Sequence, residues 1–272
     1  MIGTLMLCQS NTNRAPRWRL NALHMAAWHG CSVPVFGRIL DKIKDVNAGN
    51  NQNRTAITIA LAEKHLDLVE SLLKVEDIDV NISDNVTGKN ALHWASTRLC
   101  SPYLYKQILD KINNVNAKTA YPPKGFGKTA FMLAVSNDLR DMVILLLAHS
   151  DILVNMRDEV NKFTTLHFAV SYDRRYILQL LLGDDRINTA VENRDGRTPL
   201  KYAVDIKHLE CARILHEYEQ HKAFRDDHYH VHGCPRLSNW GGPPIPPWIP
   251  LDEQSVKSLT RRSLTQNSHQ TP

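Results

Sequence analysis

The stretch NALHMA, residues 21–26, decides how this chain folds, because the same pattern returns five more times. A small polar residue is followed by a small or apolar residue and an apolar residue, often by His, and the stretch ends in Ala. The other copies are TAITIA (55–60), NALHWA (90–95), TAFMLA (129–134), TTLHFA (164–169) and TPLKYA (198–203), and successive starts lie 34, 35, 39, 35 and 34 residues apart. A period of this length predicts a repeat protein.

Paired apolar residues follow every copy except the last. Leu68-Val69 and Leu72-Leu73 show the spacing, and the same doublets occur within residues 35–40, 104–109, 142–147 and 177–182. Doublets four residues apart place a continuous apolar stripe on one side of a helix. The Asn or Thr that begins each copy is a favourable N-cap for another helix. Each unit is therefore predicted to be helix, turn, helix and polar turn, and the units have to stack because none can bury its own stripe.

Five units end in a short turn that closes on an asparagine: Asn47, Asn81, Asn116, Asn155 and Asn188. Together with the six copies, these turns resemble the ankyrin repeat, whose signature is a period of about 33 residues around T-P-L-H-x-A. The resemblance extends from Arg17 to Lys222. It implies an all-α fold, an ankyrin-repeat solenoid of stacked helix-turn-helix units joined by hairpin-like loops. It also makes Asn81 and Asn155 candidate substrates of an asparagine hydroxylase.

Three regions are expected along the chain. Residues 1–16 form an N-terminal extension, residues 17–222 form the array of about six repeats, and residues 223–272 form a His- and Pro-rich polar tail that is partly disordered. The terminal repeats depart from the pattern, since Pro34 stands near the start of the second helix in the first repeat and Cys211-Ala212 replaces the first doublet in the sixth. The polar stretch HEYEQHK, residues 216–222, is typical of a solvent-facing terminal repeat.

One stretch, GFGKTAFMLA at residues 125–134, looks like a phosphate-binding loop. Such a loop requires glycine five residues before the Gly of G-K-T, and Pro122 occupies that position here. Gly127 instead stands two residues before the Thr cap, as Gly196 does in GRT. The sequence therefore predicts a turn at Gly127 and no nucleotide site.

Composition narrows the classes of function. The chain has 33 basic and 28 acidic residues and a net charge of +5, which is too small an excess for a dedicated nucleic-acid binder. The five cysteines are scattered without a CxxC pair, so we expect reduced thiols in the cytosol or the nucleus. The N-terminal MIGTLMLC lacks the basic flank and the length of a secretory signal. No run approaches the roughly 18 apolar residues of a membrane span.

Signatures of enzymes are missing from the sequence: we find no nucleophile elbow, kinase signature, HExxH or dinucleotide-binding turn. We therefore expect a monomer that is not an enzyme and has no cofactor, no metal, no membrane or nucleic-acid partner and no small-molecule substrate. His24, His93 and His167 stand one per repeat and cannot converge on an ion. The resemblance implies instead that they tie neighbouring turns together by hydrogen bonds.

The resemblance also implies that a partner protein docks on the tips of the hairpin-like loops and on the concave surface formed by the first helices. The residues at the family's variable contact positions, with two aromatics of the long loop, are Trp18, Trp28, His29, Arg54, Glu63, Lys89, Arg98, Tyr121, Phe126, Lys128, Asn137, Phe163, Tyr172, Arg194 and Arg197. Aromatic and Arg side chains are frequent interface anchors.

Several of these residues allow a second interpretation. Trp18 and Trp28 either contact the partner or cover the exposed end of the first repeat. Four basic residues precede a helix cap: Arg54, Lys89, Lys128 and Arg197. They form either a basic edge that favours an acidic partner or a solvated rim of charge. The enlarged loop at residues 117–127 is either a contact finger or a neutral insertion.

The tail leaves its role open. In an extended chain His228, His230, His232 and Cys234 would point to one side, where they could bind zinc, although the usual ligand spacing is missing. NWGGPPIPPW, residues 239–248, is either a ligand for aromatic-lined grooves or folds back on the last repeat through its two tryptophans.

The function predicted from these features is a non-enzymatic scaffold that binds another protein. The alternative is an adaptor, or a bacterial effector secreted into the host cytosol, whose tail recruits a second factor such as a ubiquitin ligase.

Overall fold

The computed structural model describes residues 20–97, 100–120 and 126–232, with side chains described as far as residue 222. The regular elements of this part of the chain are all helices, and one isolated antiparallel bridge joins Lys118 to Thr129. The predicted all-α fold class is confirmed. The chain divides into two compact units, and the division falls between Leu133 and Ala134.

Two kinds of helix alternate along the chain. The helices that begin at a copy of the repeated motif are called anchor helices: α2 (Ala22–His29), α4 (Ala56–Glu63), α6 (Ala91–Ala95), α8 (Ala130–Ser136), α10 (Thr165–Ser171) and α12 (Pro199–Asp205). Those that follow them are called stripe helices: α3 (Val33–Leu40), α5 (Leu66–Leu73), α7 (Pro102–Asp110), α9 (Arg140–Leu147), α11 (Arg175–Leu182) and α13 (Leu209–His232).

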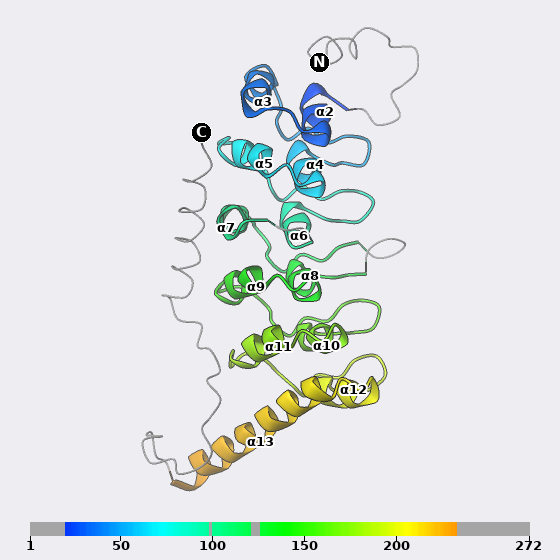
Figure 1. The fold of residues 1–272 in the computed structure, drawn as a ribbon, viewed down its shortest axis with the longest axis vertical. Helices are drawn as coiled ribbons and strands as arrows, with labels where there is room; N and C mark the ends of the chain where they lie inside the picture. Colours follow the sequence, from blue (N-terminus) through cyan, green and yellow to red (C-terminus); the bar gives the residue numbers. More distant parts are fainter. Residues whose placement is uncertain (1–19, 98–99, 121–125, 233–272) are drawn as a thin grey trace. The chain divides into compact units, whose positions relative to one another are not determined.

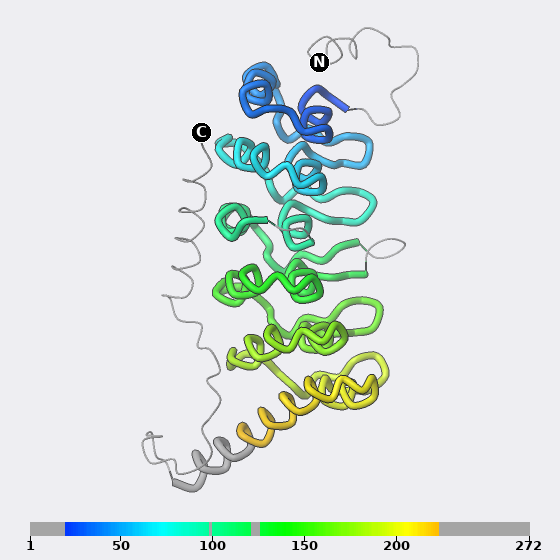
Figure 2. Tube along the Cα trace, viewed as in Figure 1, coloured from blue at the N-terminus to red at the C-terminus, as the bar shows by residue number. Residues whose placement is uncertain are grey.

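Each unit stacks these helices in two rows. In unit 1, α2, α4 and α6 lie side by side in one row, and α3, α5 and α7 lie in the other (Figure 1). In unit 2, α10 packs on α12, while α11 packs on both α9 and α13. In unit 1 the hairpin loops project from the row of anchor helices, on the side away from the stripe helices (Figure 2). The predicted stacking of helical pairs is thus confirmed within each unit.

The apolar doublets form the core. Leu68, Val69, Leu72 and Leu73 of α5 are all buried, and so are the doublets of α7, α9 and α11. In α3, at one end of unit 1, only Phe36 is fully buried. That difference follows from position, because among the described residues α3 has a neighbouring stripe helix, α5, on one side only.

The sixth repeat keeps a core despite its departures from the pattern. Cys211 and Ala212 are buried where other repeats have larger apolar residues, and Leu215 is buried one turn further along α13. Tyr218, within the polar stretch, is only 4% exposed and extends this core. Pro34 is tolerated because it lies in the first turn of α3, where a backbone N–H has no partner to lose.

Helix α13 continues to His232, beyond the predicted end of the array at Lys222. Residues 228–232 are therefore helical, so the extended arrangement considered for His228, His230 and His232 does not apply to them. Cys234 and the Pro-rich stretch lie outside the described residues. The physical reason is the absence of Gly and Pro between Leu209 and His232, so nothing breaks the helix before Gly233. In the part of the chain that the structure covers, no helix is both long and apolar enough to span a membrane.

Candidate functional site

The hairpin loops have a common backbone geometry. The N–H at the start of each donates to the carbonyl at its end, in the pairs Asn50–Arg54 (3.0 Å), Asp84–Lys89 (3.0 Å), Thr119–Lys128 (2.9 Å), Asp158–Phe163 (2.9 Å) and Asn193–Arg197 (2.9 Å). The residue before each closing position has a positive φ, including Gly127 at 62°. The turn predicted at Gly127 is confirmed, and the Lys and Thr that follow it close a hairpin and precede α8.

Neighbouring hairpins are bonded to one another within each unit. In unit 1 the N–H of Asn85 donates to Gln52 at 2.8 Å, and that of Ala120 donates to Thr87 at 2.8 Å. In unit 2 the N–H of Arg194 makes the equivalent bond to a carbonyl of the preceding hairpin, also at 2.8 Å. These bonds hold each row of loop tips in register, so the side chains they carry project from a fixed backbone.

Buried histidines attach the hairpins to the anchor helices. In each case Nδ1 faces the backbone N–H of the capping residue and Nε2 lies near a carbonyl about one repeat further on. His24 Nε2 is 2.9 Å from the Ala48 carbonyl, and His93 Nε2 is 3.0 Å from that of Ala117. In unit 2, His167 Nε2 is 3.0 Å from the Arg197 carbonyl. The hydrogen-bonding role predicted for these three residues is confirmed.

Burial keeps these histidines neutral near pH 7. Desolvation lowers the pKa of His93 to about 4, outweighing the effect of its bond to Ala117. Desolvation also lowers the pKa values of His24 and His167. In the neutral ring Nδ1 accepts and Nε2–H donates, which matches the partners on both sides. Among the described residues there is no group of three His, Cys, Asp or Glu side chains placed to hold a metal ion.

The asparagines that close the polar turns bond each turn to the turn of the next repeat. In unit 2 the amide of Asn155 donates to the Arg186 carbonyl at 2.7 Å and accepts from the N–H of Asn188 at 2.8 Å. In unit 1, Asn47 and Asn81 make the same pair of bonds to the turn of the next repeat. Each amide thus joins two turns, and hydroxylation of Asn81 or Asn155 stays a prediction.

The predicted contact residues differ in exposure. Among the described residues the exposed large aromatic side chains are Trp28 (39%), Phe126 (57%) and Tyr172 (46%). Each of the three lies on a hairpin or at the C-terminal end of an anchor helix. The polar members His29, Glu63, Asn137 and Arg194 are also exposed. Trp18, Arg98 and Tyr121 lie outside the described residues.

Phe163 is not exposed, as a contact residue would be. Its side chain is 7% exposed and stacks on His167 at 5.2 Å between ring centroids. Its ring also meets those of Phe168 and Tyr202 edge-on. Phe163 is therefore a core residue of unit 2, and its assignment to a partner surface is corrected.

The basic residues of the predicted edge are held in different ways. In unit 1, Arg54 and Lys89 both lie over the ring of Trp94, with Arg54 Cζ at 5.1 Å and Lys89 Nζ at 4.5 Å from its centroid. Lys128 Nζ lies 5.6 Å from the ring of Phe126. In unit 2, Arg197 pairs with Asp205 at 3.1 Å. Sequence reasoning missed Trp94, although a Trp at the variable position of L-H-x-A was a signal that could have found it.

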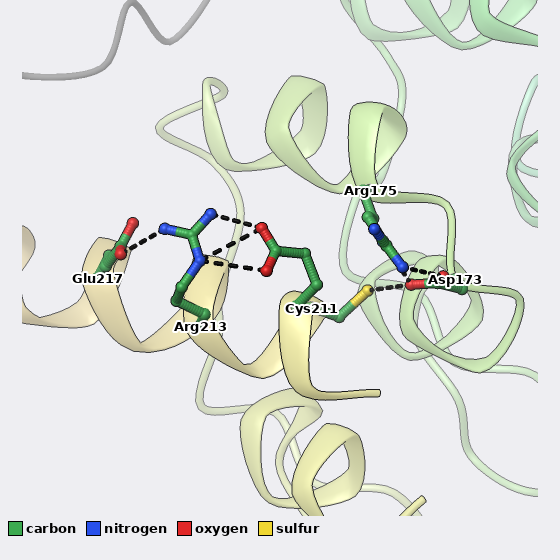
Figure 3. Close-up of polar contacts among 6 residues, drawn as sticks. Asp173, Arg175, Cys211, Arg213 and Glu217 are labelled. Carbon is green, nitrogen blue, oxygen red and sulfur yellow. Dashed lines mark hydrogen bonds and ion pairs between the residues drawn. The ribbon is translucent and has the colours of Figure 1, made fainter. Parts of the chain in front are cut away.

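A polar cluster around Cys211 has a structural role (Figure 3). The Cys211 thiol donates to Asp173 Oδ1 at 3.2 Å, and Arg175 donates to both carboxylate oxygens of Asp173. Burial raises the pKa of Cys211 to about 12, so the group stays a thiol and is a poor nucleophile. The cluster connects the start of α11 to α13, and beside it Arg213 pairs with Glu217 along α13 (Figure 3).

Comparison with known proteins extends over most of the chain. A family model described as ankyrin repeats (3 copies) matches residues 23–119, 97–193 and 155–226. The ankyrin repeat protein FPV223 of fowlpox virus (strain NVSL) is 27% identical over 147 residues, which are 54% of this chain and 96% of the viral protein. Rabankyrin-5 of Homo sapiens is 26% identical over 174 residues, 63% of this chain but 14% of that protein. The structure is also similar to the crystal structure of the ankyrin repeat domain of Bcl-3. The match covers 72% of this chain and 85% of the Bcl-3 chain, with a TM-score of 0.61 and 22% sequence identity.

Proposed function

The chain belongs to the ankyrin-repeat family, and on that premise we propose that it is a non-enzymatic scaffold that binds a partner protein. Ankyrin repeats are in general modules of protein–protein interaction. In each unit, the proposed surface consists of the hairpin loops and of the turns in which anchor helices end. It is called the hairpin surface below.

One observation carries this proposal. The exposed large aromatic side chains of the described residues, Trp28, Phe126 and Tyr172, all belong to the hairpin surface. Aromatic residues bury a large area when a partner covers them and are common hot spots of binding. The stripe helices expose the apolar side chains of Val33 (44%) and Leu209 (70%), but within the described residues none of their exposed large side chains is aromatic.

The backbone beneath this surface favours binding. Hairpins bonded to their neighbours and to buried histidines have little freedom left to lose when a partner docks. A surface that is ordered in advance avoids part of the entropic cost of association.

The test is quantitative capture of a partner protein by the full chain and by a variant of the hairpin surface. The variant replaces Trp28, Phe126 and Tyr172 with Ser. Because 39–57% of each residue is exposed, the substitutions remove only part of a packed surface, and the free energy of unfolding should fall by only about 1 kcal/mol per site. Capture should weaken by at least about 2 kcal/mol, which is roughly thirtyfold in Kd.

A control variant changes exposed residues away from the hairpin surface: Glu70, Lys106 and Arg213 on stripe helices, and Leu153 in a polar turn, all to Ser. Leu153 is 59% exposed, so the control also removes an apolar side chain. The control should bind like the natural chain. If it loses more affinity than the hairpin-surface variant, the partner docks on the stripe helices and the proposal fails.

The tail can be tested in the same assay. A chain that ends at His232 keeps α13 whole, whereas one that ends at Lys222 cuts the helix within its length. Full capture by the chain ending at His232 is expected. If the chain that ends at His232 captures no partner, binding belongs to the tail instead.

A further inference from the structure

One cluster on the hairpin surface of unit 1 indicates the chemistry of the partner. Trp94 lies in α6 and is 9% exposed, and Arg54 and Lys89 lie over its ring from the hairpins that precede α4 and α6. An indole N–H, a guanidinium and an ammonium are all donors and have no acceptor. The three side chains of the cluster therefore supply only donors and carry two positive charges.

Two of these donors are unused. Within the residues that the structure describes, Nε1 of Trp94 and Nε of Arg54 are buried and have no hydrogen-bond acceptor. Native folds pair nearly all of their buried polar atoms, so two unpaired donors in one cluster need an explanation. An acceptor that enters the cluster from outside would satisfy both donors and offset the repulsion between the two cations.

The backbone at both cations is fixed. The N–H of Arg54 donates to Oδ1 of Asn50 at 3.0 Å, and its carbonyl lies 3.1 Å from Nε2 of His24. The carbonyl of Lys89 accepts from the N–H of Asp84 at 3.0 Å. The carboxylate of Asp84 accepts hydrogen bonds from its own hairpin. The long side chains of Arg54 and Lys89 can therefore rotate toward a ligand while their Cα atoms stay in place.

We propose that Arg54, Lys89 and Trp94 form a site for the carboxylate of a Glu or Asp side chain in an acidic segment of the partner protein. In the free protein the two cations cover the indole. In the complex they turn outward, the carboxylate oxygens accept from the Arg54 guanidinium and the Trp94 indole N–H, and Lys89 neutralises the remaining charge. This deepens the proposed function and rests on it, since it names the chemistry of the partner that the scaffold binds.

Charge complementarity favours a carboxylate over a phosphate here. The site holds one guanidinium and one ammonium, whereas phosphorylated segments are recognised by clusters of Arg. A carboxylate carries a single negative charge and only acceptor atoms, which matches a site of two cations and two unused donors.

The test observes the indole N–H of Trp94 by NMR in the full chain. Its resonance is assigned through its disappearance in Trp94→Phe, and the probe is a short end-blocked peptide of alternating Glu and Ser at low ionic strength. The resonance should move downfield and saturate as the N–H gains an acceptor. A Gln–Ser peptide of the same length should not move it, and a phosphoserine version of that peptide is the third probe.

Variants then test each part of the site. Arg54→Gln with Lys89→Gln should raise the Kd of the Glu–Ser peptide at least about tenfold. Trp94→Phe, which keeps a ring beneath the cations and removes the N–H, should weaken binding about threefold when binding is followed by peptide fluorescence. The matched control is Lys74→Gln, at the C-terminal end of α5, with Lys106→Gln in α7; it removes the same charge and should leave the Kd unchanged.

Several results would overturn the site. An unmoved Trp94 resonance, an equal shift with the Gln–Ser peptide, or an equal loss of affinity in the Lys74 and Lys106 control would each show that no carboxylate binds there. Tighter binding of the phosphoserine peptide would replace the carboxylate with a phosphate. Failure here leaves the proposed function to its own test, because partner capture depends on Trp28, Phe126 and Tyr172.

Discussion

Acid should destabilise the fold through the buried histidines, and His93 should contribute most. Its side chain is 1% exposed, and desolvation lowers its pKa from 6.5 to about 4. Below pH 6.5 this histidine is therefore protonated in the unfolded chain but stays mostly neutral in the folded chain. Stability falls as the pH decreases from 6.5 toward 4, because protonation favours the unfolded state.

The size of the effect follows from the two pKa values. Near pH 4.5 an unfolded His with a pKa of 6.5 is almost fully protonated, whereas His93 with a pKa of about 4 is mostly neutral in the fold. The linkage relation then gives a loss of about 2.5 kcal/mol at that pH from His93. The lowered pKa values of His24 and His167 act in the same direction.

The assay is urea unfolding of the natural chain and of His93→Gln near pH 7.5 and near pH 4.5. Gln does not titrate, and its amide can donate to the Ala117 carbonyl as Nε2 does. The advantage of the natural chain over the variant should therefore shrink by about 2.5 kcal/mol between the two conditions. Carboxylates titrate in both proteins, and their contribution cancels in the difference.

If the difference in the free energy of unfolding stays constant with pH, within about 0.5 kcal/mol, the pKa of His93 is not lowered in the fold. This would mean that His93 is either protonated in the fold or open to water. In both cases the neutral hydrogen-bonded link between α6 and the following hairpin would have to be abandoned.

Three further changes test the frame of the fold. Leu146→Ala removes a fully buried side chain from α9 and should cost about 2–5 kcal/mol in urea unfolding; a loss below about 0.5 kcal/mol would place Leu146 outside the core. Gly88→Ala adds a Cβ only 2.4 Å from the backbone N of Ala120 at a φ of 66°, and it should lower the melting temperature by several degrees, roughly 1–3 kcal/mol of strain; an unchanged melting temperature would contradict the close packing of the hairpins. Asn155→Ala loses two hydrogen bonds to the next turn and should cost about 1–3 kcal/mol, so a neutral result in unfolding would show that this turn is not held by the amide.

Much of the fold could be predicted from sequence because its signals are periodic. Leu146 and Leu181 fall in doublets that recur once per repeat in the first five repeats, and both are fully buried. The face of the helix that is buried follows from the local spacing of apolar residues, so it can be predicted without knowing which residues of other repeats pack against it. The continuation of α13 to His232 was also present in the sequence, as a run without Gly or Pro.

The candidate site was harder to predict because it depends on contacts across repeats. Phe163 occupies the position that holds Arg54 or Lys89 in other copies, yet it is buried because Tyr202, in the next anchor helix, packs on its ring. Trp94 becomes important only because two cations from separate hairpins lie over it. Arg54 and Trp94 are 40 residues apart, and Phe163 and Tyr202 are 39 residues apart, so the spacing within one motif does not describe these contacts.

Hydrogen–deuterium exchange of the chain, free and in complex with a captured protein, shows whether the partner docks on the hairpin surface. Binding should slow exchange in the hairpins at residues 50–54, 84–89 or 193–197, and in the turns that follow the anchor helices. Exchange in the stripe helices should stay as it is in the free chain. Protection confined to α5, α7, α9 and α11, with the hairpins unchanged, would show that the partner docks on the stripe helices instead.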